Sequence, residues 1–284
     1  ARLFEWVMQD PDFKRDLFRF IDVLPTLQTS RQIAQHVQAY LLKEDRALPW
    51  PIRTVLKAST AGYSVGLPAG VIRKSAVRLA RNFIAGQTPQ DALSALRLLH
   101  QEGMGFSVDL LGEATVSERE ADDYQARYLE LINLLSDRVL HWPTDEMIDY
   151  DHLGTLCRAN ISLKVSALEP HLDPVDMNGS VQRLKKRVLP ILLCAKERDT
   201  FVNFDLEQWA YHEITYCLFE DLLGHSHLRT WPHLGIVVQA YLKDACQDVE
   251  RLVSLAKTRG VPITVRLTKG AYWDFEVARA RQHG

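Results

Sequence analysis

The chain has 284 residues, of which 46% are hydrophobic and 25% are charged, and its formal net charge is −2. These values are ordinary for a globular chain that buries a core, and they exclude an intrinsically disordered chain. The weak net charge gives no general reason to expect a nucleic-acid partner, and the lack of a long apolar run or a signal-peptide pattern predicts an intracellular, cytoplasmic chain.

The N-terminal part of the chain has the pattern of amphipathic helices. Apolar residues recur three and four positions apart in FKRDLFRFIDVL, from Phe13, and in IRKSAVRLARNFIAG, from Ile72. Between them lie a proline-marked break, DRALPWP, and a glycine-rich stretch, ASTAGYSVGLPAG. That stretch lacks the G-x-G-x-x-G and G-K-[ST] patterns of phosphate-binding loops, so a plain loop is expected. We expect residues 1–97 to form a helical region that precedes a second domain, residues 98–284.

In the second part, short runs rich in Val, Ile and Phe alternate with longer amphipathic segments. The runs are GFSVDLLGE, NISLKVSAL, FVNFDLEQ, LGIVVQAY and ITVRLTKG, starting at Gly105, Asn160, Phe201, Leu234 and Ile263. Because a helix and two loops fit between successive runs, the pattern predicts repeated right-handed βα units and an α/β fold with a parallel sheet. Both a (β/α)₈ TIM-type barrel and an open doubly wound sheet fit this pattern.

Each predicted strand has one polar face, because alternate side chains of a strand point to the same side. The polar set comprises Ser107, Asp109, Glu113, Ser162, Lys164, Ser166, Asn203, Asp205, Glu207, Gln239, Arg266 and Thr268. A sheet covered by helices on both faces should be apolar on both faces. These polar residues therefore need to face a space that holds water or a ligand. The mouth of a barrel supplies one, which favours the barrel over the open sheet.

The charges of this set suggest a ligand site. Four acids face Lys164 and Arg266, so the space suits a cationic amine as well as an anionic oxygen. Arg266 is suited to donate to a ring nitrogen or an anion, because its guanidinium is planar and permanently charged. Gly270 allows the backbone to approach a ligand, and Tyr272 and Trp273 offer aromatic surface. The alternative is that the charges only pair with one another inside a filled barrel.

Taken in order, the strand motifs resemble a known family. VDLLGEA, SLKVSAL, NFDLEQ, VVQAYLKD and VRLTKGAYWD are similar to motifs of the proline dehydrogenase domain of bacterial proline utilization A proteins, and FKRDLFRFIDVLPTL resembles the helical arm before that barrel. The resemblance implies FAD-dependent oxidation of L-proline to 1-pyrroline-5-carboxylate, with hydride transfer to flavin N5 and electron transfer to a membrane quinone. It also implies peripheral contact with the membrane surface, and it is compatible with a homo-oligomer and with a downstream aldehyde dehydrogenase domain.

The resemblance assigns roles to matching positions. Arg266 would lie near flavin N5, and Gln239 would bond to the pyrimidine side of the ring. Lys164 and Tyr272 would face the proline and, with Arg266 and Asp205, form the catalytic set. Asp205 would hold the cations of the substrate site in place, and Asp109 and Glu113 would be the acids that order the pocket around Lys164. The remaining cofactor contacts would be Leu206, Val237, Thr268, Lys269, Gly270, Ala271 and Trp273.

Two departures from the family pattern stand out. Thr268 and Leu206 occupy positions where the family has Val and Met, which are mild changes. The chain also contains five predicted strands, whereas a complete barrel has eight. The paired arginines that bind the proline carboxylate in the family belong to the later portion, so we expect the chain to be part of a longer protein.

Two other interpretations remain open. One is a Schiff-base barrel of the aldolase kind, with Lys164 or Lys269 as the nucleophile. The other is a non-catalytic scaffold whose polar strand faces hold only internal ion pairs.

No metal site is expected. His225, His227 and His233 lie irregularly spaced in the loop-like HSHLRTWPH, and the four cysteines are widely separated, as is typical of reduced thiols that pack in the core. The basic run RLKKRVLP is expected to be the solvated side of a helix, with no role in nucleic-acid binding.

Overall fold

The structure is a computed structural model, and it describes residues 10–27, 29–43, 53–54, 57, 84–112 and 114–283. The chain forms two compact units, residues 1–85 and 86–284. The boundary expected after Arg97 falls inside helix α6 (Pro89–Gln101), which belongs to the second unit.

The first unit contains the helices α2 (Pro11–Val23), η1 (Leu24–Thr26) and α3 (Ser30–Leu41). The helix predicted from FKRDLFRFIDVL is confirmed as α2, and its apolar face packs on that of α3 through Phe13, Phe20, Ile33 and Val37. A capping box starts α3: the Gln32 amide donates to the Thr29 hydroxyl, and the Thr29 amide donates to the Gln32 side chain. The predicted segments DRALPWP, ASTAGYSVGLPAG and most of IRKSAVRLARNFIAG lie outside the described residues.

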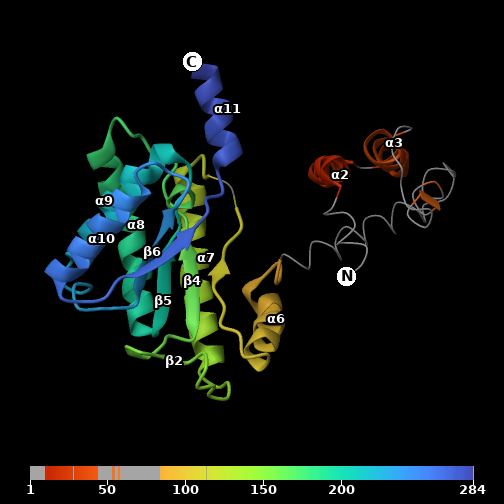
Figure 1. Ribbon diagram of the computed structural model, residues 1–284. Helices are drawn as coiled ribbons and strands as arrows, with labels where there is room; N and C mark the ends of the chain where they lie inside the picture. Colours follow the sequence, from red (N-terminus) through yellow and green to blue (C-terminus); the bar gives the residue numbers. More distant parts are fainter. Residues whose placement is uncertain are drawn as a thin grey trace. The chain divides into compact units, whose positions relative to one another are not determined.

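The second unit is built on a parallel sheet with the strand order β1-β4-β5-β6-β7 (Figure 1). Its strands are β1 (Val108–Asp109), β4 (Ala159–Leu163), β5 (Thr200–Phe204), β6 (Leu234–Gln239) and β7 (Thr264–Thr268). Each lies within or overlaps one of the five predicted runs, and every neighbouring pair is parallel. The predicted βα repeat is therefore confirmed.

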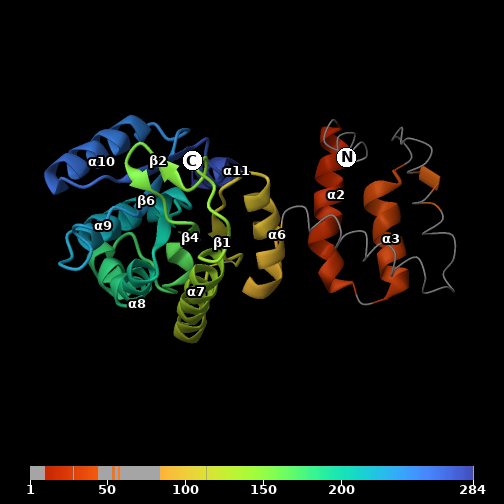
Figure 2. The same cartoon turned by 90° about the horizontal axis from the view of Figure 1, so that it is seen from below.

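Helices connect these strands. They are α7 (Glu118–Val139), α8 (Met177–Glu197), α9 (His212–Leu223) and α10 (Ala245–Arg259), with α11 (Trp273–His283) after β7 and short 3₁₀ turns η2 (Val165–Ala167) and η3 (Trp209–Tyr211). In Figure 2, α7 to α10 form an arc on one side of the sheet. The strand order follows the chain order without reversal, as in a (β/α)₈ barrel, whereas a doubly wound sheet reverses at a switch point.

The apolar face of the sheet packs against these helices. Its fully buried residues include Ile161, Leu163, Val202, Phe204 and Ile236. Phe204 contacts Phe219 of α9 edge to face, with ring centroids 5.2 Å apart, and each such side chain contributes about 1.5–3 kcal/mol by leaving water. In β7 the apolar residues Val265 and Leu267 are 37% and 66% exposed, and no residue of the following helix α11 is buried.

The basic run in α8 is helical, as predicted, but two of its arginines do not simply face solvent. The Arg183 and Arg187 side chains form ion pairs with the buried Glu169 at 3.3 and 3.2 Å. Glu169 lies just after η2, so the pairs hold α8 against the connection that leaves β4.

A short hairpin that the sequence did not predict lies between α7 and β4. It pairs β2 (Tyr150–Asp151) with β3 (Gly154–Thr155). Arg158, before β4, ties this connection to α7: its Nε and Nη2 atoms donate to both carboxylate oxygens of Asp149 at 3.0 and 2.7 Å, and Nη1 donates to the Trp142 carbonyl oxygen at 2.8 Å. This bidentate pair is largely buried, with the two side chains 19% and 4% exposed.

We expect Arg158→Ala to lower the free energy of local opening at β4 by about 3–5 kcal/mol, because Asp149 would keep its burial and lose its partner. Arg198→Ala is the matched control, since the Arg198–Asp137 pair is 45% and 61% exposed and such pairs contribute about 0–1 kcal/mol. Native-state hydrogen exchange of the β4 amides measures both changes. Equal effects of the two substitutions would contradict this assignment.

Candidate functional site

The polar residues of the strands meet on the face of the sheet opposite helices α7 to α10. The strand register places Asp109 beside Ser162, and Ser162 beside Asn203, so polar residues of neighbouring strands form rows. Hydrogen bonds and ion pairs connect eight of them. These eight, named here the inner-face cluster, are Ser107, Asp109, Asn160, Ser162, Lys164, Asn203, Asp205 and Arg266.

Lys164 lies at the end of β4 and joins two acids of the cluster. Its ammonium nitrogen contacts the Asp109 carboxylate directly and lies 3.5 Å from Oδ2 of Asp205. Its backbone amide donates to the Tyr128 hydroxyl of α7 at 3.3 Å, which fixes the end of the strand. Burial raises the pKa of Asp205, and this outweighs the opposing effect of Lys164. The site therefore holds a carboxylate with a raised proton affinity beside a cation.

Arg266 connects the two ends of the sheet. From β7, its Nη1 atom donates to the Ser162 hydroxyl at 3.0 Å and lies 3.4 Å from Oδ1 of Asp205, while Nη2 donates to the Ser107 hydroxyl at 3.1 Å. Ser107 directly precedes β1, at the other end of the strand order. In a flat sheet, strands spaced about 4.8 Å apart would place β1 and β7 about 19 Å from each other. The contact therefore shows that the sheet curls with its polar face inward.

Asn160 belongs to this network, although the sequence analysis did not select it. It accepts a hydrogen bond from the Ser107 hydroxyl at 2.8 Å, and its position in β4 has the same parity as Ser162 and Lys164. Strand alternation was thus a usable signal for this residue. Tyr128 was also missed, and it lies on a helix, where strand alternation gives no signal.

A second group lies where β5 and β6 end. Glu207 accepts hydrogen bonds from the Ser166 hydroxyl at 2.5 Å and from the Ser166 amide at 3.0 Å. Burial raises the pKa of Glu207, although the Ser166 bonds oppose the shift. Gln239 donates from Nε2 to the Leu206 and Glu207 carbonyl oxygens at 3.3 and 3.2 Å. Its Oε1 atom is buried without a partner among the residues that the structure describes, so an acceptor is left for a ligand donor.

The loop after β7 brings aromatic residues to the same end of the sheet. Gly270 has a φ of 118°, and a Cβ atom there would lie 1.6 Å from the ring of Tyr241. Tyr241 contacts Trp273 edge to face at 6.1 Å. Burial, followed by the fields of Glu207, Asp205 and Asp109, raises the pKa of Tyr272 to about 12. The Tyr272 phenol is therefore neutral at physiological pH and lies within the field of the acids.

The other predicted site residues vary in exposure. Leu206 and Val237 are buried, Thr268 is partly buried, and Lys269, Ala271 and Trp273 are exposed. Glu113 lies outside the described residues.

A cavity of about 700 Å³ lies elsewhere, between η3, α10 and α11. Four of its charged or titratable residues are paired: the His212 and Asp248 side chains approach to 2.9 Å, and Arg251 binds Glu213 at 2.9 Å. We assign this cavity no ligand.

Comparison with known proteins gives consistent matches along the chain. The family model for proline dehydrogenase matches residues 92–284, and the model for the proline utilization A N-terminal domain matches residues 1–83. The "Bifunctional protein PutA" of Escherichia coli (strain K12) is 31% identical over 218 residues, which are 75% of this chain and 16% of that protein. "Proline dehydrogenase 1" of Bacillus subtilis (strain 168) is 25% identical over 193 residues, which are 68% of this chain and 52% of that protein.

A solved structure shares the fold. Proline utilization A from Bdellovibrio bacteriovorus, inactivated by N-propargylglycine, superposes with a TM-score of 0.85 at 37% identity, covering 99% of this chain and 27% of that one. The α/β fold predicted from the sequence is confirmed: it is that of the proline dehydrogenase domain, a TIM-type barrel, with an N-terminal helical region. The chain spans 16% of the length of the bifunctional relatives that it matches.

We expect Gly270→Ala to lower the unfolding temperature more than Gly260→Ala does. Both glycines have positive φ, but only at Gly270 would the added methyl group collide with a neighbour, the ring of Tyr241. At Gly260 nothing lies within 4 Å, so this control reports backbone strain alone. Thermal unfolding of both variants, each in the full-length protein, measures the difference. A smaller effect at Gly270 would show that the Tyr241 ring moves away without cost.

Proposed function

This chain belongs to the proline dehydrogenase family, and on that premise we propose that the protein oxidises L-proline to 1-pyrroline-5-carboxylate with FAD as its cofactor. The observation that carries the proposal is the inner-face cluster, in which Lys164, Asp205 and Arg266 converge on the inside of the curled sheet. The activity is proposed for the whole protein, because the chain spans a small part of its bifunctional relatives.

The residues at the ends of β5 to β7 fit a flavin. The buried Oε1 atom of Gln239 needs a donor, and a ring N–H supplies one. Leu206 and Val237 present buried apolar surface for a flat ring. We propose that the cofactor is held by Leu206, Val237, Gln239, Arg266, Thr268, Lys269, Gly270, Ala271 and Trp273.

FAD, when bound, supplies a two-electron acceptor for the hydride that leaves the proline ring carbon beside the nitrogen. Arg266 would place a permanent positive charge beside the acceptor and stabilise the negative charge that develops there. Its bonds to Ser107 and Ser162 hold the guanidinium in one orientation before the substrate enters. This preorganisation is the main contribution that we assign to Arg266.

The substrate end of the site rests on Lys164. Proline is a zwitterion, and the Lys164 ammonium would attract its carboxylate, while Asp109 and Asp205 hold that ammonium in place. The neutral Tyr272 phenol would pack against the proline ring without adding a charge. We propose Lys164, Asp205, Tyr272 and Arg266 as the catalytic set, with Asp109 and Glu113 completing the substrate pocket.

The remaining partners are proposed from the resemblance of the strand motifs. They are a quinone acceptor at the membrane surface, reached by peripheral contact from the cytoplasm, a homo-oligomeric partner, and an aldehyde dehydrogenase domain in the same polypeptide. The name of the bifunctional relatives supports a second activity in the whole protein.

In the described part of the chain, no helix is both long and apolar enough to span a bilayer.

The aldolase interpretation finds less support. A Schiff-base lysine is activated in a hydrophobic pocket or beside another cation, whereas the Lys164 nitrogen contacts the carboxylates of Asp109 and Asp205. Lys269 is exposed, so it does not lie in such a pocket. The scaffold interpretation explains the ion pairs, but it does not explain why the Oε1 atom of Gln239 is buried without a hydrogen-bond partner among the described residues.

The proposal is tested by the absorbance spectrum of the full-length protein, recorded anaerobically before and after addition of L-proline. We expect flavin bands that bleach. In stopped-flow experiments, Arg266→Met should slow this bleaching by about 10²-fold or more, as is typical when a charge-stabilising donor is removed. Arg198→Met, at the exposed pair with Asp137, is the control and should leave the rate unchanged.

A protein that stays colourless after reconstitution with FAD would refute the proposed function. An unchanged bleaching rate in Arg266→Met would refute only the role given to Arg266.

We expect Lys164→Ala to weaken proline binding while the flavin content stays at the wild-type level. Lys164 contacts acids of the substrate pocket, and its side chain makes no bond to the residues proposed to hold the cofactor. Proline titration of the flavin spectrum gives the dissociation constant, and the absorbance ratio of flavin to protein gives the cofactor content. Loss of flavin with unchanged proline affinity would contradict the assignment.

A further inference from the structure

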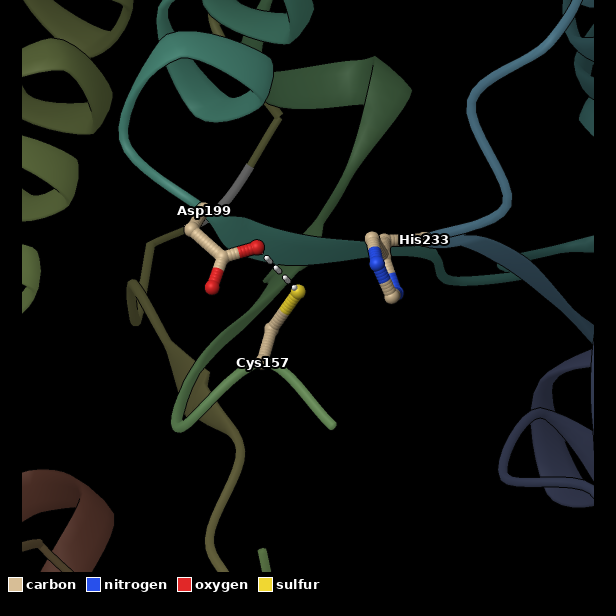
Figure 3. A group of neighbouring side chains, drawn as sticks. All are labelled: Cys157, Asp199 and His233. Atoms are coloured by element: carbon tan, nitrogen blue, oxygen red, sulfur yellow. Dashed lines mark hydrogen bonds between the residues drawn. The ribbon is translucent and has the colours of Figure 1, made fainter. Parts of the chain in front are cut away.

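Three side chains able to bind a metal ion meet at the amino-terminal ends of three neighbouring strands (Figure 3). Cys157 lies shortly before β4, Asp199 directly before β5, and His233 directly before β6. Their sulfur, carboxylate oxygen and imidazole nitrogen atoms all lie within 4.8 Å of one another. This rim is at the opposite end of the strands from Lys164 and Gln239.

The strand pairing holds these residues in place. The Val202 amide of β5 donates to the His233 carbonyl oxygen at 3.2 Å, so the backbone of His233 is bound to the neighbouring strand. The Trp231 ring contacts the His233 ring edge to face at 6.4 Å. The Cys157 thiol donates to Oδ1 of Asp199 at 3.3 Å. Each ligand therefore comes from a different βα unit and is positioned by its own strand.

The distances suit a zinc ion. With bond lengths of about 2.3 Å to sulfur and about 2.0–2.1 Å to nitrogen or oxygen, tetrahedral zinc ligands lie about 3.5 Å from each other. The sulfur–oxygen pair is already at 3.3 Å. Side-chain rotations that move the ligand atoms by about one ångström would bring all three to the spacing of tetrahedral zinc ligands. A thiolate favours zinc over magnesium and calcium, which prefer oxygen ligands.

We propose that Cys157, Asp199 and His233 bind one Zn²⁺ ion, with water as the fourth ligand. The thiol gives up its hydrogen bond to Asp199, and its proton is released to solvent on binding. A thiolate and a carboxylate then balance the double positive charge of the ion. Arg198, next to Asp199, pairs with Asp137 at 3.0 Å rather than with the site.

The position of the site indicates a structural role. In barrel enzymes the amino-terminal end of the strands serves stability, while the chemistry takes place at the carboxyl end. An ion at this rim would join the starts of β4, β5 and β6, and it would stabilise the folded state by mass action because only that state assembles the three ligands.

The spacing of Cys and His residues in the sequence gave no sign of this site. The three ligands are far apart along the chain and become neighbours only through the sheet. In the motif HSHLRTWPH, the rings of His225 and His227 lie 5.5 Å from each other, while His233 joins Cys157 and Asp199.

The test uses the full-length protein, stripped with a chelator and then titrated with Zn²⁺ against a chromophoric competitor. We expect one tight site per chain and a rise in the unfolding temperature with Zn²⁺. Cys157→Ser, Asp199→Asn and His233→Gln should each weaken binding by more than about tenfold, the scale at which even supporting residues of metal sites act. Cys246→Ser and His227→Gln, which change the same residue types outside the site, should bind as wild type.

Substitution with Co²⁺ supplies an independent readout. Thiolate-to-cobalt charge-transfer absorption should appear in the wild type and be absent from Cys157→Ser. Asp199→Asn guards against misfolding, because Asn tolerates the positive φ of 48° at this position. The proposal is overturned if the wild type binds no stoichiometric Zn²⁺, or if the three site variants bind it as tightly as the two controls.

Discussion

The hydrogen bond from Arg266, on the last strand of the sheet, to Ser107, next to the first strand, expresses the constraint on which the rest of this structure depends. Parallel strands linked by helices on one side must curl, and curling encloses the other face. Helices α7 to α10 lie on the other side of the sheet (Figure 2), so the polar side chains of this face must satisfy one another or a ligand. The inner-face cluster does this with two cations, Lys164 and Arg266, set against Asp109 and Asp205. The pairing makes burial of the charges tolerable, and the raised pKa of Asp205 shows that desolvation is not fully offset.

Much of this arrangement was predictable from the sequence. Alternation of polar and apolar residues identified all five parallel strands and sorted Ser162, Lys164 and Asp205 onto one face, because strand geometry has a strict period of two. The same logic applied to Asn160, which was overlooked. The curling of the sheet was expected only by analogy with barrels, and the contact from Arg266 to Ser107 now supplies its physical evidence.

What the sequence could not predict depends on contacts between distant residues. The β2–β3 hairpin has exposed, unpatterned strands, so hydrophobic periodicity gave no signal for it. Arg158 and Asp149 are close in the chain, yet their bidentate geometry follows from the way α7 ends against β4. The meeting of Cys157 with His233 follows from the alignment of strand starts, which is a property of the sheet. Charge patterns likewise suggested that Arg187 was solvated, whereas a buried partner, Glu169, defines its role.

The strand order has a consequence for how the chain acquires its structure during synthesis. Within the five-stranded sheet, each strand after β1 pairs with the strand of that sheet made before it, so each new βα unit that leaves the ribosome finds its docking edge already formed. Adding strands one at a time closes mostly short loops. Closing a short loop costs little chain entropy and is fast. The bonds of Arg266 to Ser107 and Ser162 are exceptions, because they join residues 159 and 104 positions apart. The polar face can therefore assemble only after β7 has been made, and the candidate site is among the last parts of this unit to form.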